Sequence, residues 1–339
     1  MKRVSIAALV LAAASATFAG ARPADDPLDR LLRAALDAPS SISYAGTVEV
    51  VRLGSHAADV SVYRIEHRAP NLTRRDYTAP SALAGDSMVT KGTLMYSIDP
   101  KRHRIVERRD DEFADPGAFR AEYGLLRANY RVTQTGPETY DGRSVVDLAF
   151  VSRYTHRTTT RLRVDTVSKV VLDKQEFSAD GGLLAETRFE AIRYTPAAAQ
   201  DFALPSGYTT QRQVGAAVGL ESPERITRDV GFTVREPRSL PEGFAPVEGT
   251  FVEMRGVRTA HLLYCDGLRT VSLFENAQAS TLEATTLRPR TMRVGAYEAE
   301  YAEDGPTALL AWSDGALHYT LVGEVGQVDL PHLAVAVTP

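Results

Sequence analysis

Apolar residues change their spacing along the chain, and each spacing predicts a type of element. Between residues 26 and 38, leucine and alanine recur at intervals of three and four, which is typical of an amphipathic helix packed on a sheet. From residue 41 to residue 110, apolar and polar positions alternate in short runs that glycine and proline interrupt. This alternation predicts short antiparallel strands.

A second helix is predicted to begin at Asp115-Pro116, which supplies a capping carboxylate and a proline at the first helical position. An apolar stripe then follows at spacings of four, three and four, formed by Phe119, Tyr123, Leu126 and Tyr130. We expect this stripe to face the sheet. It forms either solid core or, if the sheet curls only part-way round the helix, an apolar groove that accepts an acyl chain.

The remaining pattern divides the chain into two β-rich domains, and 339 residues are enough for two cores. The turn Asp180-Gly181-Gly182 predicts a hairpin, and a second hairpin is predicted at Asp266-Gly267. Further strands of the first part are predicted over residues 143–153, 158–165, 169–178 and 183–194. Residues 195–228 hold Pro196, three consecutive alanines and Pro205 but few large apolar residues, which is typical of a linker. We predict a first domain at residues 29–205, a linker at 206–228, and a second domain at 229–339.

Composition and charge are those of a folded, soluble protein, with 44% apolar and 24% charged residues. The net charge of −4 gives no overall attraction to nucleic acid, so we expect no nucleic-acid partner. The charge is uneven. Residues 1–205 carry 28 basic and 26 acidic side chains, whereas residues 206–339 carry 11 and 17 and contain no lysine. This difference indicates two units with different surfaces.

The first 21 residues resemble a secretory signal peptide. Met1-Lys2-Arg3 precedes an alanine-rich apolar run from Val4 to Ala19, which is shorter than the ~20 residues of a membrane span. We therefore predict a cleaved signal at residues 1–21 and an exported mature chain. Cys265 is the only cysteine, which excludes an internal disulfide, and its apolar neighbours predict a buried structural residue.

The sequence offers no catalytic, metal or cofactor motif. The seven histidines are scattered, without the spacing that places two imidazoles on one helix or strand face. Serine-nucleophile elbows, phosphate-binding glycine loops and dinucleotide fingerprints are absent. We predict a protein that is not an enzyme and that holds no metal and no cofactor.

Arginines cluster in the first domain, most regularly at the alternating positions Arg157, Arg161 and Arg163. The simplest interpretation is a solvated sheet face, because charge on exposed strands also prevents edge pairing. The functional alternative is an anionic-ligand rim, since the planar guanidinium group suits phosphate and carboxylate oxygens.

Two stretches of the second domain carry a family resemblance. Leu240-Pro241-x-Gly243-Phe244 and the run from His261 to Phe274, which contains Tyr264 and Asp266-Gly267-Leu268, are similar to motifs of the MucB/RseB family. Cys265 stands where that family often has serine. In the first domain, residues 165–172 with the 180–182 turn and Phe189 resemble the strand–hairpin core of the lipoprotein carriers LolA and LolB.

The resemblance implies an α+β fold that is mostly antiparallel. A LolA-like half-barrel sheet curves over helices, and a smaller β-rich C-terminal domain follows. It also implies a non-catalytic periplasmic regulator of a sigma-E type, envelope-stress sigma factor. The C-terminal domain would bind the periplasmic region of a transmembrane anti-sigma factor and protect it from proteolysis, while the N-terminal domain senses lipid or lipoprotein.

The same resemblance implies two sets of site residues. Tyr264, Asp266 and Leu268 would contact the anti-sigma factor, and acyl chains of lipoprotein or lipopolysaccharide would contact the apolar stripe. A LolA/LolB-like lipoprotein or lipid carrier without regulatory output is the alternative. A homo-oligomer is compatible with both interpretations. Neighbouring genes for a sigma factor and a single-span anti-sigma factor would favour the regulator.

Overall fold

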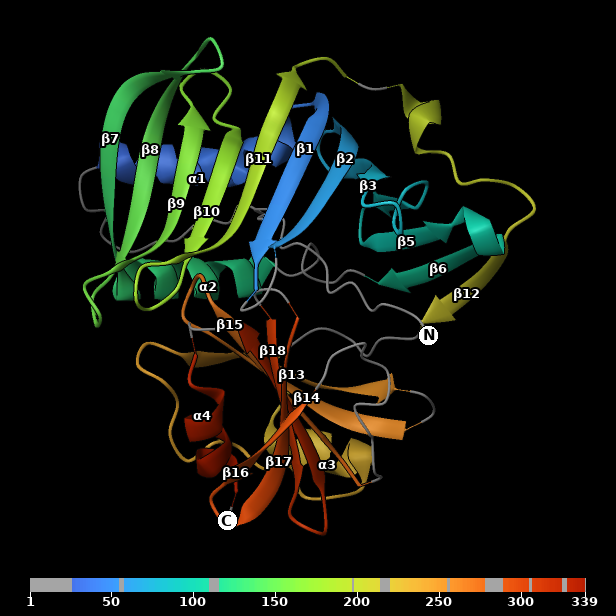
Figure 1. Cartoon of the computed structure of the whole chain (residues 1–339), viewed down its shortest axis with the longest axis vertical. Coiled ribbons are helices and arrows are strands. Elements are labelled where there is room, and N and C mark those ends of the chain that lie inside the picture. Colours follow the sequence, from blue (N-terminus) through green and yellow to red (C-terminus); the bar gives the residue numbers. More distant parts are fainter. Residues whose placement is uncertain are drawn as a thin grey trace.

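The computed structural model describes residues 26–54, 58–109, 116–196, 198–213, 220–254, 257–277, 289–304, 307–324 and 328–338. Within them, two sheets lie one beyond the other along the long axis of the molecule (Figure 1). The predicted signal peptide and Asp115 lie outside the described residues. None of the described helices is both long and apolar enough to cross a membrane.

The first sheet contains twelve described strands in the order β12-β6-β5-β4-β3-β2-β1-β11-β10-β9-β8-β7. Adjacent strands of this sheet are antiparallel, except β12 and β6, which are parallel. The strands are β1 (Tyr44–Leu53), β2 (Ala58–Arg68), β3 (Leu72–Ala79), β4 (Ser87–Lys91), β5 (Leu94–Asp99), β6 (Arg104–Arg109), β7 (Tyr130–Tyr140), β8 (Arg143–Ser152), β9 (Thr158–Asp165), β10 (Val171–Phe177), β11 (Leu183–Arg193) and β12 (Thr209–Gln213). The sheet curves, and α1 crosses behind β7 to β11 (Figure 1).

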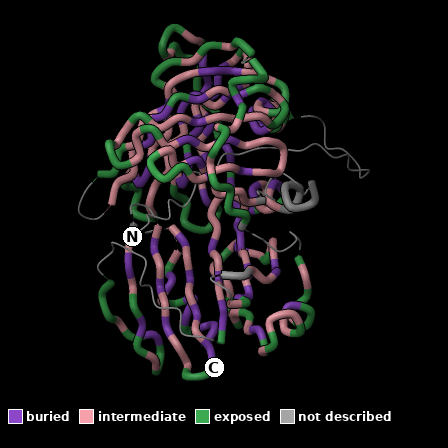
Figure 2. The backbone as a smooth tube through the Cα atoms, turned by 90° about the vertical axis from the view of Figure 1, so that its right-hand side faces the viewer, coloured by how far each residue is buried: buried purple, intermediate pink, exposed green. Residues whose placement is uncertain are grey.

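The second sheet contains seven described strands, all antiparallel, in the order β13-β14-β15-β19-β18-β17-β16. They are β13 (Ala245–Met254), β14 (Val257–Cys265), β15 (Thr270–Asn276), β16 (Arg290–Val294), β17 (Tyr297–Asp304), β18 (Thr307–Ser313) and β19 (His318–Glu324). Burial alternates strictly along β18 and β19, which is the period of two expected when one face of a strand is covered (Figure 2).

Four α-helices are described: α1 (Pro27–Ser41), α2 (Pro116–Asn129), α3 (Pro223–Val230) and α4 (Leu330–Val337). Two short 3₁₀ helices, η1 (Pro100–Arg102) and η3 (Ala199–Phe202), lie in the first part of the chain. The helices predicted from residue 26 and from residue 116 are confirmed, and the Asp26 carboxylate accepts the Leu28 N–H at 3.1 Å as an N-cap. In Figure 1, α2 lies between the first sheet and the second.

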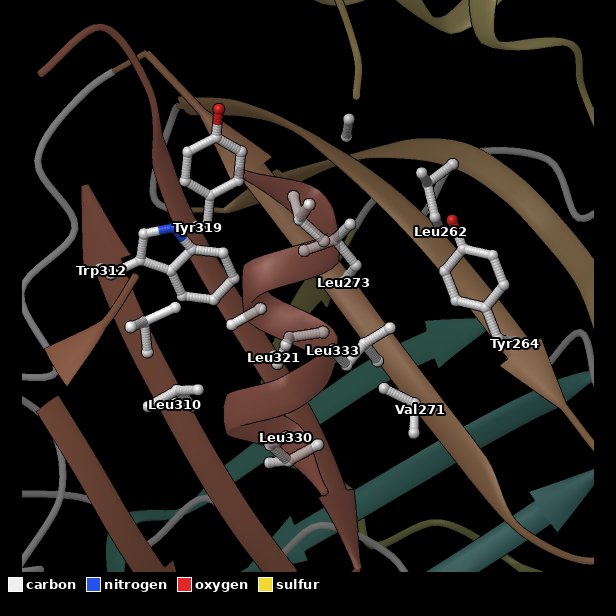
Figure 3. Packing of buried hydrophobic residues seen from close by; sticks show 14 of the residues in the cluster. Leu262, Tyr264, Val271, Leu273, Leu310, Trp312, Tyr319, Leu321, Leu330 and Leu333 are labelled. Carbon is white, nitrogen blue, oxygen red and sulfur yellow. The ribbon is translucent and has the colours of Figure 1, made fainter. Parts of the chain in front are cut away.

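Helix α4 was not predicted, because its apolar residues also suit the strand-rich pattern around it. Leu330, Leu333, Ala334 and Val337 are nevertheless spaced by three, four and seven, and all four are buried. The helix packs across one face of the second sheet, against Leu273 and Leu321 (Figure 3). Helix α4 therefore covers this face of the second sheet and completes its hydrophobic core.

The segment predicted as a linker supplies a strand to the first sheet and most of a helix that packs on the second. Residues 209–213 form β12 and pair with β6, whereas α3 packs against β13 and β14. We call the part from α1 to β12 the N-terminal unit and the part from Leu220 to α4 the C-terminal unit. The predicted fold class is confirmed: an α+β chain with a curved, largely antiparallel first sheet over helices and a smaller β-rich second part. The domain boundaries at residues 205 and 229 stay predictions.

Candidate functional site

The tip of the β14–β15 hairpin meets the C-terminal end of α2. At this tip Gly267 has a φ of +102°, and a Cβ atom added there would lie 2.2 Å from the amide nitrogen of Leu126. Only a residue without a side chain permits this approach, and only glycine adopts this φ without strain. The Asp-Gly pair that predicts a hairpin from sequence therefore also brings the two units into contact.

Asp266 occupies the centre of this contact and is only 1% exposed. Its Oδ1 accepts the backbone N–H groups of Leu268 at 3.0 Å and Arg269 at 2.8 Å, which fixes the turn. Its Oδ2 accepts the hydroxyl of Tyr130 from the N-terminal unit at 2.6 Å and forms an ion pair with Arg269. A buried carboxylate is tolerated because every bond that it can accept is supplied.

Asn129, the last residue of α2, joins the two motifs that carry the family resemblance. Its Nδ2 donates to the carbonyl oxygens of Gly243, at 2.8 Å, and Asp266, at 2.9 Å. Its Oδ1 accepts the Tyr154 hydroxyl at 2.9 Å. We call Asn129, Tyr130, Gly243, Asp266 and Gly267 the hairpin contact. Asn129 was not among the predicted site residues. Its only signal in the sequence is an amide residue next to Tyr130, the last position of the apolar stripe.

A cavity of about 370 Å³ lies beside the hairpin contact. Residues of α1, β1, β2, β3, β10 and β11 line it from the N-terminal unit, and residues of β15, β18 and β19 line it from the C-terminal unit. We call it the inter-unit cavity. Its volume falls in the range of small-molecule sites. Its walls include the apolar side chains of Tyr44, Val48, Ile65, Phe189 and Val322.

Charged and polar groups line two parts of this cavity. One group is Lys174, Glu176 and Glu324, in which the Lys174 ammonium lies 2.6 Å from a Glu176 carboxylate oxygen. The other is Arg75 with His67, whose ring stacks on Tyr44 at 4.7 Å between centroids. Burial lowers the pKa of His67 and raises the pKa of Tyr44 to about 12, so both side chains stay neutral near pH 7.

Glu324 provides a pH-dependent contribution to stability. Burial, and then the nearby Glu176 carboxylate, raise its pKa from 4.5 to about 7. The folded protein thus keeps a proton that the unfolded chain has lost, so this contribution is complete below pH 4.5 and disappears as the pH rises through about 7. As the pH rises from 4.5 through about 7, we expect the free energy of unfolding of the wild type to fall by about 1–3 kcal/mol relative to that of Glu324→Gln.

Urea denaturation at half-unit steps from pH 4.5 to 8 measures this difference. Glu300→Gln, at an exposed position on β17, is the control and should leave the pH dependence unchanged. Parallel stability curves for the wild type and Glu324→Gln would show that Glu324 does not titrate abnormally.

The described side chains of the predicted acyl-binding stripe do not line the inter-unit cavity. Tyr123, Leu126 and Tyr130 are buried in one core cluster with Leu32 and Leu36 of α1. The side chain of Phe119 lies outside the described residues. The pattern thus predicts which face is covered, and the structure places α1 and the sheet against that face. Lipid binding by this stripe stays a prediction, and the inter-unit cavity offers a separate location.

The three arginines of the predicted anionic rim lie apart from the inter-unit cavity. Arg163 forms ion pairs with Asp147 at 3.0 Å and Asp173 at 3.4 Å. Arg161 lies over the Phe177 ring at 5.7 Å, and Arg157 donates to the Asp180 carbonyl oxygen. The Arg163 guanidinium is therefore already paired with carboxylates of neighbouring strands. A role for the three in binding an anion stays a prediction.

The residues predicted to contact an anti-sigma factor lie at or behind the hairpin contact. Tyr264 and Asp266 are buried, and Leu268 packs against the core of the N-terminal unit and lines the inter-unit cavity. Leu268 is open to the inter-unit cavity, whereas Asp266 is buried and would become accessible to a partner only if the two units separated. Their contact with a partner stays a prediction.

Reactive chemistry receives no support from the described residues. Cys265 is buried, and burial raises the pKa of its thiol to about 12, which confirms the structural role predicted for it. His261 stacks on Phe274, and burial lowers its pKa to about 4. In the described ranges, no three histidine, cysteine or carboxylate side chains gather in a way that could hold a metal ion.

These features define a class of protein: two β-sheet units that share one ligand-sized cavity and one buried polar contact. Solved structures of MucB have this fold. The chain aligns with MucB in complex with MucA(peri) at a TM-score of 0.59 and 20% identity, covering 91% of this chain and 98% of that chain. The Pseudomonas aeruginosa MucA/MucB complex gives 0.59 and 19% over the same shares, and MucB alone gives 0.53 and 18%, covering 91% and 96%. No family model and no curated protein matches the chain.

Proposed function

We propose that this protein is a MucB/RseB-like binding protein that holds the periplasmic region of a transmembrane anti-sigma factor. The observation that carries the proposal is the alignment with MucB in complex with MucA, which extends over both units and 91% of the chain. A fold shared over one unit alone would leave the function open, because one sheet architecture serves many functions.

In this proposal the protein acts in the periplasm as a negative regulator of an envelope-stress sigma factor. By covering the anti-sigma factor it protects that factor from proteolysis, so the sigma factor stays bound and inactive. The apolar start of the chain, which predicts export, supports this location. Binding rather than catalysis agrees with the buried, neutral states of Cys265 and His261.

We further propose that the N-terminal unit senses lipid or lipoprotein. The inter-unit cavity supports this part, because its lining is largely apolar and comes from both units. A ligand there contacts β1 and β2 on one side and β15 and β19 on the other. It changes the affinity for the anti-sigma factor only if it binds one arrangement of the two units more tightly than the other. A lipid carrier without regulatory output is the second candidate, since the same cavity also serves a carrier.

The test is a calorimetric titration of the full mature chain with the periplasmic region of a single-span anti-sigma factor from the same organism. We expect a 1:1 complex with a Kd of about 1 µM or below, and slower cleavage of that region by a site-specific protease. The control is a peptide of the same composition in scrambled order.

Two outcomes separate the candidates. If the chain binds fluorescent fatty acid but does not bind the anti-sigma region at 100-fold higher concentration than the expected Kd of about 1 µM, the carrier replaces the regulator. If the chain binds the anti-sigma region and lipid leaves that affinity unchanged, regulation by lipid is wrong while anti-sigma binding stands.

A further inference from the structure

Two adjacent arginines on β3 have opposite surroundings. Arg74 pairs with Asp76 at 2.9 Å, and that carboxylate also accepts the Ser87 hydroxyl at 2.6 Å. Arg75 is only 8% exposed and lines the inter-unit cavity. Successive residues of a strand point to opposite faces, so Arg75 shares the inner face with the apolar residues of the curved sheet.

Arg75 has no carboxylate partner among the described residues. Its Nε is buried without a hydrogen-bond partner there, and its Nη1 reaches only the Met88 sulfur, at 4.0 Å. The ring of Tyr63 lies 5.7 Å from the guanidinium carbon, which stabilises a cation weakly compared with an ion pair. A buried charge is costly unless it is paired, so an unpaired arginine in a cavity wall indicates a missing anionic partner.

The surroundings of Arg75 favour an amphiphile over a small polar anion. Val48, Ile65 and Phe189 line the same cavity, and the Tyr44 ring packs edge-on against Phe189. These walls exclude water from one side of the guanidinium group, which strengthens its interaction with an anion. They also offer an apolar surface that an inorganic ion would leave uncovered.

The acidic groups of the cavity do not neutralise Arg75. Glu176 is held by Lys174, and Glu324 is placed near the same ammonium group on the side of the C-terminal unit. The charged lining is thus cationic at Arg75 and Arg52 and of mixed sign at Lys174, Glu176 and Glu324. A volume of about 370 Å³ lies at the small end of the range for ligand sites, which suits one acyl chain rather than several.

We propose that the inter-unit cavity binds a single-chain amphiphile with an anionic headgroup, whose carboxylate or phosphate oxygens accept hydrogen bonds from the Arg75 guanidinium. The acyl chain lies against Val48, Ile65 and Phe189. The proposal rests on the lipid-sensing part of the proposed function and specifies its ligand class. It also assigns ligand recognition to β3, outside both the apolar stripe of α2 and the arginines of β9.

The experiment compares three amphiphiles with the same oleoyl chain: oleate, oleoyl lysophosphatidate and the neutral monoolein. Each is titrated below its critical micelle concentration into the full mature chain. We expect both anions to bind about tenfold or more tightly than monoolein, because a hydrogen bond to a charged group is strong in a buried site. The tighter of the two anions identifies carboxylate or phosphate as the natural headgroup.

Arg75→Met should remove this preference and leave monoolein binding unchanged, whereas Arg75→Lys should retain part of it. Arg64→Met is the matched control, because Arg64 lies on the neighbouring strand β2 at an exposed position. The variant also has a stability readout that does not depend on ligand affinity. Losing an unpaired buried charge should raise the Tm of ligand-free Arg75→Met. Oleate should raise the Tm of the wild type by more than it raises the Tm of this variant.

Failure of this proposal differs from failure of lipid sensing. If oleate and monoolein bind equally and Arg75→Met changes neither, the cavity binds lipid without recognising its headgroup, and the role of Arg75 is wrong. If no amphiphile binds, the lipid-sensing part of the proposed function is wrong as well. A marked fall in the Tm of ligand-free Arg75→Met would mean that Arg75 stabilises the fold and does not await a ligand.

Discussion

Replacing Gly267 with alanine is expected to separate the two units at the hairpin contact. The added Cβ would lie 2.2 Å from the Leu126 amide nitrogen and 2.5 Å from its Cα. These atoms belong to the backbone of α2 and cannot move aside as a flexible side chain could. Steric overlap and the positive φ together should cost about 3 kcal/mol or more.

The second sheet contains a matched control. Gly315 also follows an aspartate in a hairpin turn and has a φ of +90°, but a Cβ added there meets no atom within 4 Å. Gly315→Ala should therefore show the backbone strain alone, about 1–2 kcal/mol. Urea denaturation measures both costs, and small-angle scattering measures the separation of the units. Equal costs, with no change in radius of gyration for Gly267→Ala, would show that the contact with Leu126 is not tight.

Much of the fold follows from spacing alone. Apolar residues at intervals of three and four predicted α1 and α2, and the Asp-Gly pair predicted the hairpin at 266–267, because these signals act within a few residues. The structure has a second Asp-Gly hairpin at 314–315, between β18 and β19, which was not predicted. The two hairpins show where this information ends. Asp266 and Asp314 form the same turn. In both, Oδ1 accepts two backbone N–H groups, and Oδ2 accepts a tyrosine hydroxyl and forms an ion pair with an arginine.

The tyrosines of these two turns come from different places. Tyr319 lies five residues after Asp314, whereas Tyr130 lies 136 residues before Asp266, in the other unit. No local pattern distinguishes the two aspartates, so the sequence could not predict which one joins the units. The same limit applies to Arg75 and the cavity. The arginines of the first domain were interpreted as a solvated sheet face, and only the tertiary fold shows that Arg75 is buried, with no carboxylate partner among the described residues.

The sequence also could not predict what covers the apolar stripe of α2. Its stripe predicted burial and left open whether side chains or a ligand fill the space, because both fillings require the same apolar residues. In the structure α1 supplies Leu32 and Leu36 there, and the cavity lies under β1, β2 and β3 instead. Helix α1 therefore determines which part of the curved sheet remains available to a ligand.

Replacing Asp266 with alanine is the second change expected to have a large effect. The Arg269 guanidinium would lose its buried carboxylate, and the Tyr130 hydroxyl would lose its acceptor at 2.6 Å. Removing one partner of a buried ion pair costs about 3–5 kcal/mol, since the remaining charge stays away from water. Two backbone N–H groups of the turn also lose their acceptor. We expect a protein whose two units unfold in separate transitions.

Asp314→Ala removes an equivalent carboxylate inside the C-terminal unit and is the matched control. Both variants should lose stability, but only Asp266→Ala should loosen the units. A double-mutant cycle of Tyr130→Phe with Asp266→Asn measures the cross-unit hydrogen bond, and we expect a coupling of about 1–3 kcal/mol. A coupling near zero, together with a single unfolding transition for Asp266→Ala, would mean that packing at Gly267 alone holds the units together. Loss of the coupling in saturating oleate would show that the ligand in the cavity and the hairpin contact act on the same arrangement of the two units.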